Sequence, residues 1–307
     1  PDAEHELKAI FDAGGFTAYT MNGFPYGRFH GAGVKDAAYE PDWTRPERLA
    51  YTARLARIMA ALTPEGGFAS ISTVPGGFAP RLAGRQAAAT EGILTAVADL
   101  IKLERTTGRR VALALEPEPW CLLETIADAA SFFGAHLFSA AAASRVADLA
   151  GLSAAEARVA LPRHLGLCLD VCHLAVGFEE PEAALATLAA AGVPIHKLQL
   201  SAALAVPRMT AAARAQLAAF VDPVYLHQTV RRSGDGRLRR HLDLPDALAA
   251  FDADGADDET WRIHFHIPVY AAPPPPLGTT RDVLERVLAI HRRQPLTTHL
   301  EIETYTW

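Results

Sequence analysis

Short apolar segments alternate with longer segments of helical period along most of the chain. The apolar segments, each ending in turn or polar residues, lie at residues 16–27, 68–74, 109–120, 164–173, 194–201, 260–270 and 298–307. Between them, Ala, Leu and Arg recur at the spacing of amphipathic helices, most clearly at residues 4–15, 45–62, 84–108, 181–192 and 279–293. Such alternation of strand and helix predicts right-handed βαβ units and a parallel sheet.

The number of predicted strands indicates an α/β fold, a (β/α)₈ TIM barrel with seven of its eight strands accounted for. The chain opens on a predicted helix, so the first barrel strand is expected to be absent, and a homo-oligomer or a partner would have to cover the gap. We expect one domain over residues 1–307, with a helical insertion at about 121–162 and a β-hairpin insertion near 221–245. The alternative, a doubly wound open sheet, would need a Gly-rich phosphate loop, and neither GxGxxG nor a Walker pattern occurs.

Composition excludes several classes of partner. The 307 residues are 50% hydrophobic, and the formal net charge of −6 gives no reason to expect binding to nucleic acid or to an anionic membrane. No apolar run reaches the roughly 18 residues of a membrane span. The three cysteines are too few for a disulfide framework, and we interpret them as small buried hydrophobic residues of a cytoplasmic protein.

Acidic and imidazole side chains stand where four of the predicted strands end. They are Glu116 and Glu118, Asp170 and His173, His264 and His266, and Glu301 and Glu303. Residues two apart on a strand face the same way, so these pairs can point together into the barrel mouth, where TIM barrels carry their active sites. Converging carboxylates would repel one another unless a cation neutralised them. Oxygen and imidazole ligands suit a divalent metal among Mn²⁺, Zn²⁺, Fe²⁺, Co²⁺ and Mg²⁺.

Each of these residues also has an ordinary structural explanation. A glutamate at a strand end can partner a helix N-terminus, and two histidines in a strand can both be satisfied core residues. Glu118 and Glu303 are weaker candidates than Glu116 and Glu301 because they lie further beyond their strands. His164, His196 and His299 stand at or near strand beginnings, which is the stability face of a barrel, and are left out of the site.

Several stretches carry a resemblance to known proteins. LEPEP, LDVCH, HFH and LEIE resemble the metal-site strands of the xylose-isomerase-like TIM barrels, which include sugar isomerases, ketose epimerases and type IV apurinic endonucleases. NGFPYG with FHG, VKDAAYEPDWTRPERLAYTARLA, SISTVPGGF, CLDVCHLAV, KLQLSAAL and HLEIETYTW resemble more closely the Ebo-type metabolite-traffic proteins of that superfamily (EboE-like).

The resemblance implies metal ligands at Glu116, Asp170 and Glu301, with His173 as a ligand or a substrate contact. His264 and His266 match an Asp-x-His pair that ligates metal in the endonuclease branch. Gln199 is a departure, because it stands where the isomerases place a metal-binding histidine. Either His264 or His266 substitutes for that histidine, or metal affinity is reduced.

Three functions remain open. The first is a metal-dependent isomerase or epimerase of a small polyhydroxylated or hydroxycarbonyl metabolite, with Glu116 and Glu301 as proton acceptor and donor. Substrate contacts are then expected from Asn22, Glu118, Gln199, His227 and Glu303. The second is a non-catalytic carrier that binds its metabolite with Phe24, Tyr26, Trp120 and Tyr270. The third is phosphodiester cleavage, which the acidic balance and the missing histidine disfavour.

Overall fold

A computed structural model describes residues 2–27, 34–254 and 258–304 of the chain. Residues 28–33 and 305–307, which carry part of two of the resembling stretches, lie outside that part. The helices are α1 (Asp2–Gly14), η1 (Lys35–Tyr39), α2 (Pro46–Leu62), α3 (Ala79–Leu82), α4 (Gln86–Thr107), α5 (Ile126–Phe132), η2 (Phe133–Leu137), α6 (Ala140–Ala150), α7 (Ala154–His164), α8 (Val171–Val176), α9 (Pro181–Ala190), α10 (Ala211–Leu217), η3 (Ala218–Phe220), α11 (Leu244–Asp254) and α12 (Arg281–Arg293). The strands are β1 (Thr20–Asn22), β2 (Phe68–Thr73), β3 (Arg110–Leu115), β4 (Leu165–Asp170), β5 (Ile195–Leu200), β6 (Ala202–Val206), β7 (Thr229–Arg232), β8 (Leu238–His241), β9 (Thr260–Ile267), β10 (Gly278–Thr279) and β11 (Leu300–Ile302).

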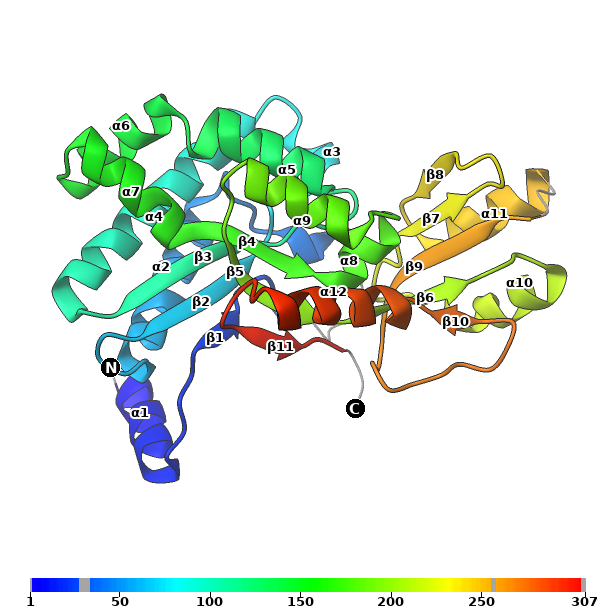
Figure 1. The fold of residues 1–307 in the computed structure, drawn as a ribbon, viewed down its shortest axis with the longest axis horizontal. Coiled ribbons are helices and arrows are strands. Elements are labelled where there is room, and N and C mark those ends of the chain that lie inside the picture. The colour runs from blue at the N-terminus through cyan, green and yellow to red at the C-terminus, as the bar shows by residue number, and fades with distance from the viewer. Residues whose placement is uncertain (1, 28–33, 255–257, 305–307) are drawn as a thin grey trace.

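Six strands form a parallel sheet in the order β1-β2-β3-β4-β5-β11. Helices lie outside it (Figure 1). The two edge strands, β1 and β11, lie close to each other. Asn22 Nδ2 on β1 donates a hydrogen bond to Glu303 Oε2, just after β11, at 3.0 Å. The Tyr19 and His299 rings, which precede the same two strands, lie 5.5 Å apart. The sheet is therefore a nearly closed barrel, which confirms the predicted α/β barrel class.

Local sequence explains the elements that were predicted most accurately. Every residue of β4 is buried, as its uninterrupted apolar run indicates for a strand covered on both faces. Pro46 stands at the start of α2, where its missing N–H costs nothing. Gly108 ends α4 in the left-handed conformation, with φ 67°. Ser153 and Glu156 form a capping box at the start of α7, within the predicted helical region at 121–162.

The second sheet is antiparallel, in the order β10-β6-β9-β7-β8. Its β7 and β8 form the hairpin predicted near 221–245. The strand predicted at 260–270 is β9, and its expected place in the parallel barrel was wrong, because it pairs antiparallel with β6 and β7. The reason lies in the connection: only Ser201 separates β5 from β6, so the chain leaves the barrel without the helical crossover that another parallel strand requires.

The antiparallel pairing brings the carboxyl end of β9 to the barrel mouth. His266 and Ile267 lie opposite Ala203 and Ala202, and Ala202 begins β6 immediately beyond β5. The histidines of β9 therefore reach the carboxyl ends of the parallel strands from the second sheet. Figure 1 shows this sheet beside the barrel, with β9 running between the two parts.

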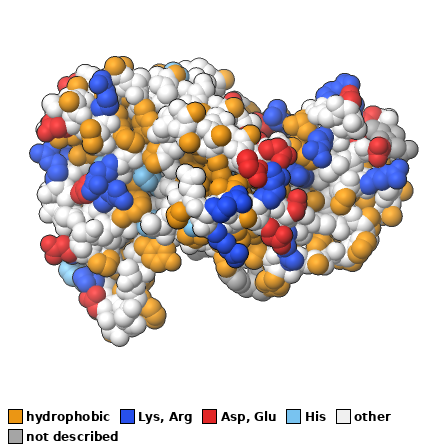
Figure 2. All heavy atoms as spheres, viewed as in Figure 1, with side chains coloured by type: hydrophobic (Ala, Val, Ile, Leu, Met, Phe, Trp, Pro, Cys, Tyr) orange, Lys and Arg blue, Asp and Glu red, His pale blue; other side chains and the backbone are white. Residues whose placement is uncertain are grey.

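The surface and the helices show two further features. On the face in Figure 2, acidic and basic side chains gather over α12 and the start of α9, where Arg286 pairs with Glu180 and Glu182. Within the described ranges, no single helix has the length and apolar character of a membrane span, although the bent pair Ile126–Leu137 and Ala140–Ala150 meets those two criteria together.

Candidate functional site

A cavity of about 360 Å³ opens at the barrel mouth. This volume is within the range of small-molecule sites. Eight of the predicted site residues line it: Asn22, Glu116, Glu118, His173, Gln199, His264, His266 and Glu303. The opposite wall is mainly aromatic and apolar, with Phe24, Tyr39, Tyr225 and Leu226. Of the four aromatic residues considered for a carrier, Phe24 alone lines the cavity; Tyr26 and Tyr270 are exposed side chains elsewhere.

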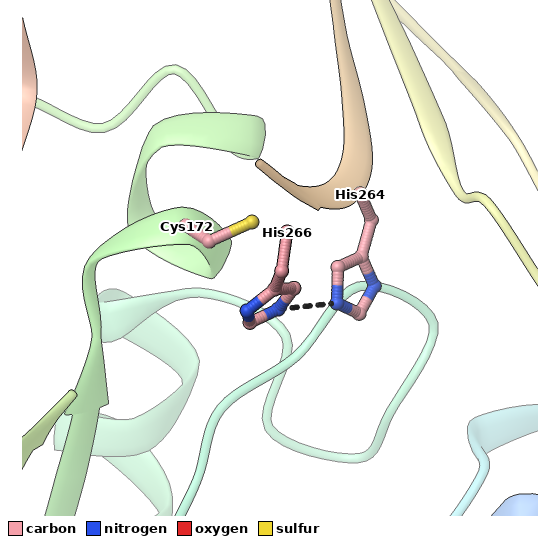
Figure 3. A group of neighbouring side chains, drawn as sticks. All are labelled: Cys172, His264 and His266. Atoms are coloured by element: carbon pink, nitrogen blue, oxygen red, sulfur yellow. Dashed lines mark hydrogen bonds between the residues drawn. The ribbon is translucent and has the colours of Figure 1, made fainter. Parts of the chain in front are cut away.

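Three histidines meet at one side of this cavity. His173 Nε2 lies 3.0 Å from His264 Nε2, and His264 Nε2 lies 3.1 Å from His266 Nε2. All three side chains are buried. Figure 3 shows His264 and His266 side by side, with the sulfur of Cys172 on α8 facing them. The prediction that two residues spaced by two on this strand face the same way is confirmed for His264 and His266.

The hydrogen-bond partners of two histidines define their tautomers. His173 Nδ1 lies 3.0 Å from the Pro117 carbonyl oxygen, which can only accept, so Nδ1 carries the proton. His264 Nδ1 lies 2.7 Å from Gln228 Oε1, which is likewise an acceptor. In both neutral rings Nε2 is therefore left with a lone pair, and these two lone pairs face each other. Two acceptors at 3.0 Å repel unless a proton or a metal cation lies between them.

Protonation is the less favourable of these two solutions. Burial lowers the pKa of His173 to about 4. Burial, together with the neighbouring His173 and His266, lowers the pKa of His264 well below its usual value. Both rings are therefore neutral near pH 7, and neutral imidazole is the form that binds metals.

Asp170 lies next to this cluster. It ends β4 and caps α8, since its Oδ1 accepts from the His173 N–H at 3.1 Å and from Ser201 Oγ at 2.6 Å. Burial would raise its pKa, but His173, His266 and the two donors lower it overall and favour the carboxylate. Its Oδ2 is buried without a hydrogen-bond partner. The carboxylate thus performs the ordinary capping role while one oxygen stays available to a cation.

The donor set suits a divalent metal. One ligand atom from each of Asp170, His173 and His266 can lie within 4.8 Å of the others, and the same is true of Glu118, His173 and His264. Two imidazole nitrogens with one carboxylate oxygen are typical donors of Zn²⁺, Mn²⁺, Fe²⁺ and Co²⁺ sites. Cys172 completes a third group with His264 and His266. However, burial raises the pKa of its thiol well above the usual value, which disfavours the thiolate that a metal needs.

Three glutamates add acid–base groups to the same cavity. Burial, reinforced by Asp170 and Glu303, raises the pKa of Glu116 well above its usual value. Burial also raises the pKa of Glu118 to about 8 and that of Glu303 to a smaller extent. One oxygen of Glu116, Oε2, is buried without a hydrogen-bond partner. These carboxyl groups are therefore protonated more readily than exposed glutamates.

Glu301 does not join this group. It lies one step deeper in the barrel, where its carboxylate forms an ion pair with the Nζ of Lys197, a side chain with no exposed surface. Lys197 Nζ also donates to Asn22 Oδ1. Glu301 does not line the cavity, whereas Glu303 does. The carboxylate expected to be the weaker candidate is the one that faces the cavity.

The remaining predicted residues are placed as follows. Gln199 lines the cavity, but its amide is engaged by Cys168 Sγ at 3.1 Å and Glu303 Oε2 at 3.3 Å rather than by the histidines. His227 does not line the cavity; its ring lies 4.9 Å from that of Phe265.

The histidines that were left out of the site have structural partners. His164 Nδ1 contacts the Val111 carbonyl oxygen, His196 Nε2 contacts that of Pro162, and His299 Nδ1 lies 2.8 Å from Ser70 Oγ. All three cysteines are buried free thiols, in agreement with the absence of a disulfide framework.

Sequence reasoning missed three residues that organise the site: Lys197, Tyr39 and Gln228. Lys197 had a signal, since a lysine in the apolar segment 194–201 needs a buried partner and lies two positions before Gln199 on the same face. Tyr39 and Gln228 stand in a short 3₁₀ helix and just before a hairpin strand, where no periodic pattern marks them.

Comparison with known proteins gives a weak likeness at the level of the fold. No family model matches the chain, and no curated protein matches it. Among solved structures, the chain is similar to one titled "Crystal structure of D-tagatose 3-epimerase-like protein", with a TM-score of 0.40 and 13% sequence identity. The match covers 65% of this chain and 61% of that chain, so this chain spans about three fifths of that protein's length. A likeness at this level says nothing about activity.

Proposed function

We propose that this protein is a metal-dependent isomerase or epimerase of a small polyhydroxylated or hydroxycarbonyl metabolite. The observation that carries the proposal is the meeting of the His173 and His264 Nε2 lone pairs at 3.0 Å on the wall of a cavity that also contains Glu116 and Glu303. Neighbouring acceptors of this kind are stable when a cation separates them. The Ebo-type setting in secondary-metabolite traffic and the cytoplasmic location rest on sequence alone.

The proposed metal ligands are His173, which belongs to two of the groups that could hold a metal, and His264, with His266 and Asp170 on one side and Glu118 on the other as the neighbouring donors. Bound there, a divalent cation would polarise two adjacent substrate oxygens and acidify the C–H bond between them. Glu116 and Glu303 stand at opposite sides of the mouth, after β3 and after β11. Glu116 accepts the proton from the substrate carbon, and Glu303 returns a proton to the opposite face. Asn22 Nδ2 and Gln199 Nε2 hold Glu303 Oε2 at 3.0 and 3.3 Å.

This assignment replaces Glu301 by Glu303 as the second acid–base residue. Glu301 is held by Lys197 beneath the cavity floor, so its carboxylate does not reach a substrate in the cavity without breaking that ion pair. Its predicted role as a ligand is therefore not part of the proposal. The alternative function, a carrier without turnover, differs in one observable respect: it binds its metabolite but leaves the C–H bonds intact.

The test begins with metal content. Protein purified without a His tag is expected to hold about one divalent metal per chain after incubation with Zn²⁺ or Mn²⁺. His264→Gln should lose it, whereas His196→Gln should keep it, because His196 is a buried histidine outside the cavity whose Nε2 lies 3.0 Å from the Pro162 carbonyl oxygen. A wild type that binds no metal, or a His264→Gln variant that binds as well as the wild type, contradicts the proposed site.

The second stage measures proton exchange. The metal-loaded wild type is incubated with ketohexoses and cyclitols in D₂O, and deuterium incorporation at carbon is followed by NMR. Glu116→Gln is expected to abolish incorporation while retaining the metal. A protein that binds both metal and sugar but exchanges no proton with any of these compounds would be a carrier.

A further inference from the structure

A chain of hydrogen bonds leads from His264 away from the histidine cluster. His264 Nδ1 lies 2.7 Å from Gln228 Oε1, and Gln228 Nε2 donates to Tyr39 Oη at 2.7 Å. The Tyr39 hydroxyl in turn donates to Glu118 Oε1, also at 2.7 Å. All four side chains are buried, so water does not compete with these bonds.

The direction of this chain is determined by its surroundings. Gln228 Nε2 also donates to the Pro119 carbonyl oxygen at 3.3 Å, which can only accept, so the amide nitrogen must lie on that side. The amide oxygen therefore faces His264, and Nδ1 of that ring must carry the proton. Every donor in the chain then points toward the Glu118 carboxyl group, and hydrogen bonds aligned in this way strengthen one another.

Both intermediate residues are held rigidly. Gln228 is tied to β9 through its backbone as well, since the His264 N–H donates to the Gln228 carbonyl oxygen at 2.8 Å. The Tyr39 ring stacks on Phe78 with centroids 5.2 Å apart and an interplanar angle of 12°. Burial, with Glu118 nearby, raises the pKa of the Tyr39 hydroxyl well above its usual value, so it remains a donor.

We propose that Gln228 and Tyr39 are positioning residues. They hold His264 with its Nε2 lone pair directed at the metal position that it shares with His173, and thereby set the affinity of the site for a divalent cation. The inference rests on the metal site of the proposed function and adds two residues that act on the metal through His264 instead of ligating it. It also changes the expectation for Glu118, which becomes the terminal acceptor of this chain instead of a substrate contact. Partners of this kind orient a ligating histidine and raise its basicity.

The experiment compares Zn²⁺ and Co²⁺ affinities of the full chain by competition with a chromophoric chelator. Tyr39→Phe is expected to bind Zn²⁺ about 10-fold more weakly, and Gln228→Leu up to about 100-fold more weakly. Tyr51→Phe is the matched control. It loses an equivalent hydroxyl, which donates to the Pro25 carbonyl oxygen at 2.8 Å and does not belong to the hydrogen-bond series from His264 to Glu118. It should bind as the wild type does.

A fourth variant separates positioning from folding. Gln228→Glu loses the donors to Tyr39 and Pro119, as Gln228→Leu does, but keeps an acceptor for the His264 Nδ1 proton. It should retain most of the Zn²⁺ affinity if the acceptor matters, and lose as much as Gln228→Leu if the residue only supports the fold. Thermal unfolding of each metal-free variant, followed by circular dichroism, verifies that the chains compared are folded.

A second readout does not depend on metal. In ¹⁵N NMR spectra of metal-free protein, His264 is expected as the Nδ1–H tautomer in the wild type and as a mixture with Nε2–H in Gln228→Leu. Unchanged affinity in both Tyr39→Phe and Gln228→Leu, or an unchanged tautomer in Gln228→Leu, overturns this inference alone when the wild type binds metal. A wild type that binds neither Zn²⁺ nor Co²⁺ overturns the proposed metal site as well.

Discussion

The ion pair between Lys197 and Glu301 leads to a quantitative prediction about the free energy of unfolding. The Lys197 side chain has no exposed surface, and the Glu301 side chain that it contacts is 29% exposed. Asn22 Oδ1 accepts from the same ammonium group and from Ser72 Oγ. The ion pair raises the pKa of Lys197 against the opposing effect of burial, so the ammonium form persists at neutral pH. Lys197→Met keeps the length of the side chain and removes its charge and donors.

The expected cost follows from what Lys197→Met leaves behind. Removing one partner of a buried ion pair costs about 3–5 kcal/mol, because the other charge remains buried and uncompensated. Glu301 is partly exposed and can be rehydrated, and Asn22 keeps its bond from Ser72, so we expect a loss near the lower limit, about 3 kcal/mol. The double variant Lys197→Met/Glu301→Gln should recover about 2 kcal/mol of that loss, since the uncompensated charge is gone.

The assay is urea unfolding of the four proteins of this cycle at pH 7 in the presence of a chelator, so that metal binding does not contribute. Two results would refute the reasoning. Either Lys197→Met costs less than about 1 kcal/mol, or the two single losses add in the double variant to within about 0.5 kcal/mol. Glu301 would then be free to act in the cavity, as the sequence resemblance implies.

Three further predictions concern other parts of the molecule. Gly92→Ala should lower the free energy of unfolding by about 1–3 kcal/mol, because the added Cβ would lie 2.2 Å from the Trp43 carbonyl oxygen, whereas Gly134→Ala, with nothing within 4 Å, should not. Glu179, which accepts from the Ile126 N–H, has its pKa raised by burial from 4.5 to about 7, so its ionisation penalises the folded state progressively as pH rises through this interval. Glu179→Gln should therefore stabilise the protein by about 2 kcal/mol more at pH 8 than at pH 5, as urea titrations can measure. Zn²⁺ at about 100 times its dissociation constant should add about 2.7 kcal/mol to the stability of the metal-free protein, and a calorimetric Tm that chelator does not lower would contradict this.

The barrel strands were predictable where one physical cause dominated. A strand covered on both faces favours an uninterrupted apolar run, and β3 has one after Arg110 and β4 has one before Asp170, whereas β2 (FASIST) and β5 (IHKLQL) include polar residues. The helix ends were marked by residues whose backbone preferences are strong, such as Pro46 and Gly108. In these elements local propensity and tertiary burial agree, so the pattern alone identifies them.

The direction of β9 was not predictable from its own residues. An apolar strand looks the same whether its neighbour runs parallel or antiparallel, and the choice is made by the connection that precedes it. The relevant signal was the absence of turn residues between β5 and β6, where the apolar run continues past Ser201 into Ala202. His264 and His266 nevertheless reach the mouth, because an antiparallel strand from a second sheet can deliver its carboxyl end to the same place.

The depth of a residue along the barrel axis is a further property that the pattern does not contain. Glu301 and Glu303 share a face, but two residues of a strand span about 7 Å, and the register of β11 against β5 decides which of them meets Lys197. That register sets Glu301 opposite Gln199, next to the buried ammonium group.

The barrel interior thus has two layers of polar side chains that differ in charge: a lower layer around Lys197 and an upper layer at the cavity. In the lower layer the carboxylate of Glu301 is matched by Lys197. In the upper layer Glu116, Glu303 and Asp170 converge beside the histidine cluster. Among the described residues that line the cavity the only lysine or arginine, Lys35, is paired with Asp243. Burial, reinforced by repulsion from Asp170 and Glu303, raises the pKa of Glu116 well above its usual value. A divalent cation at the histidines would oppose both effects and lower the pKa of Glu116, so metal binding would favour the ionised form that proton abstraction requires.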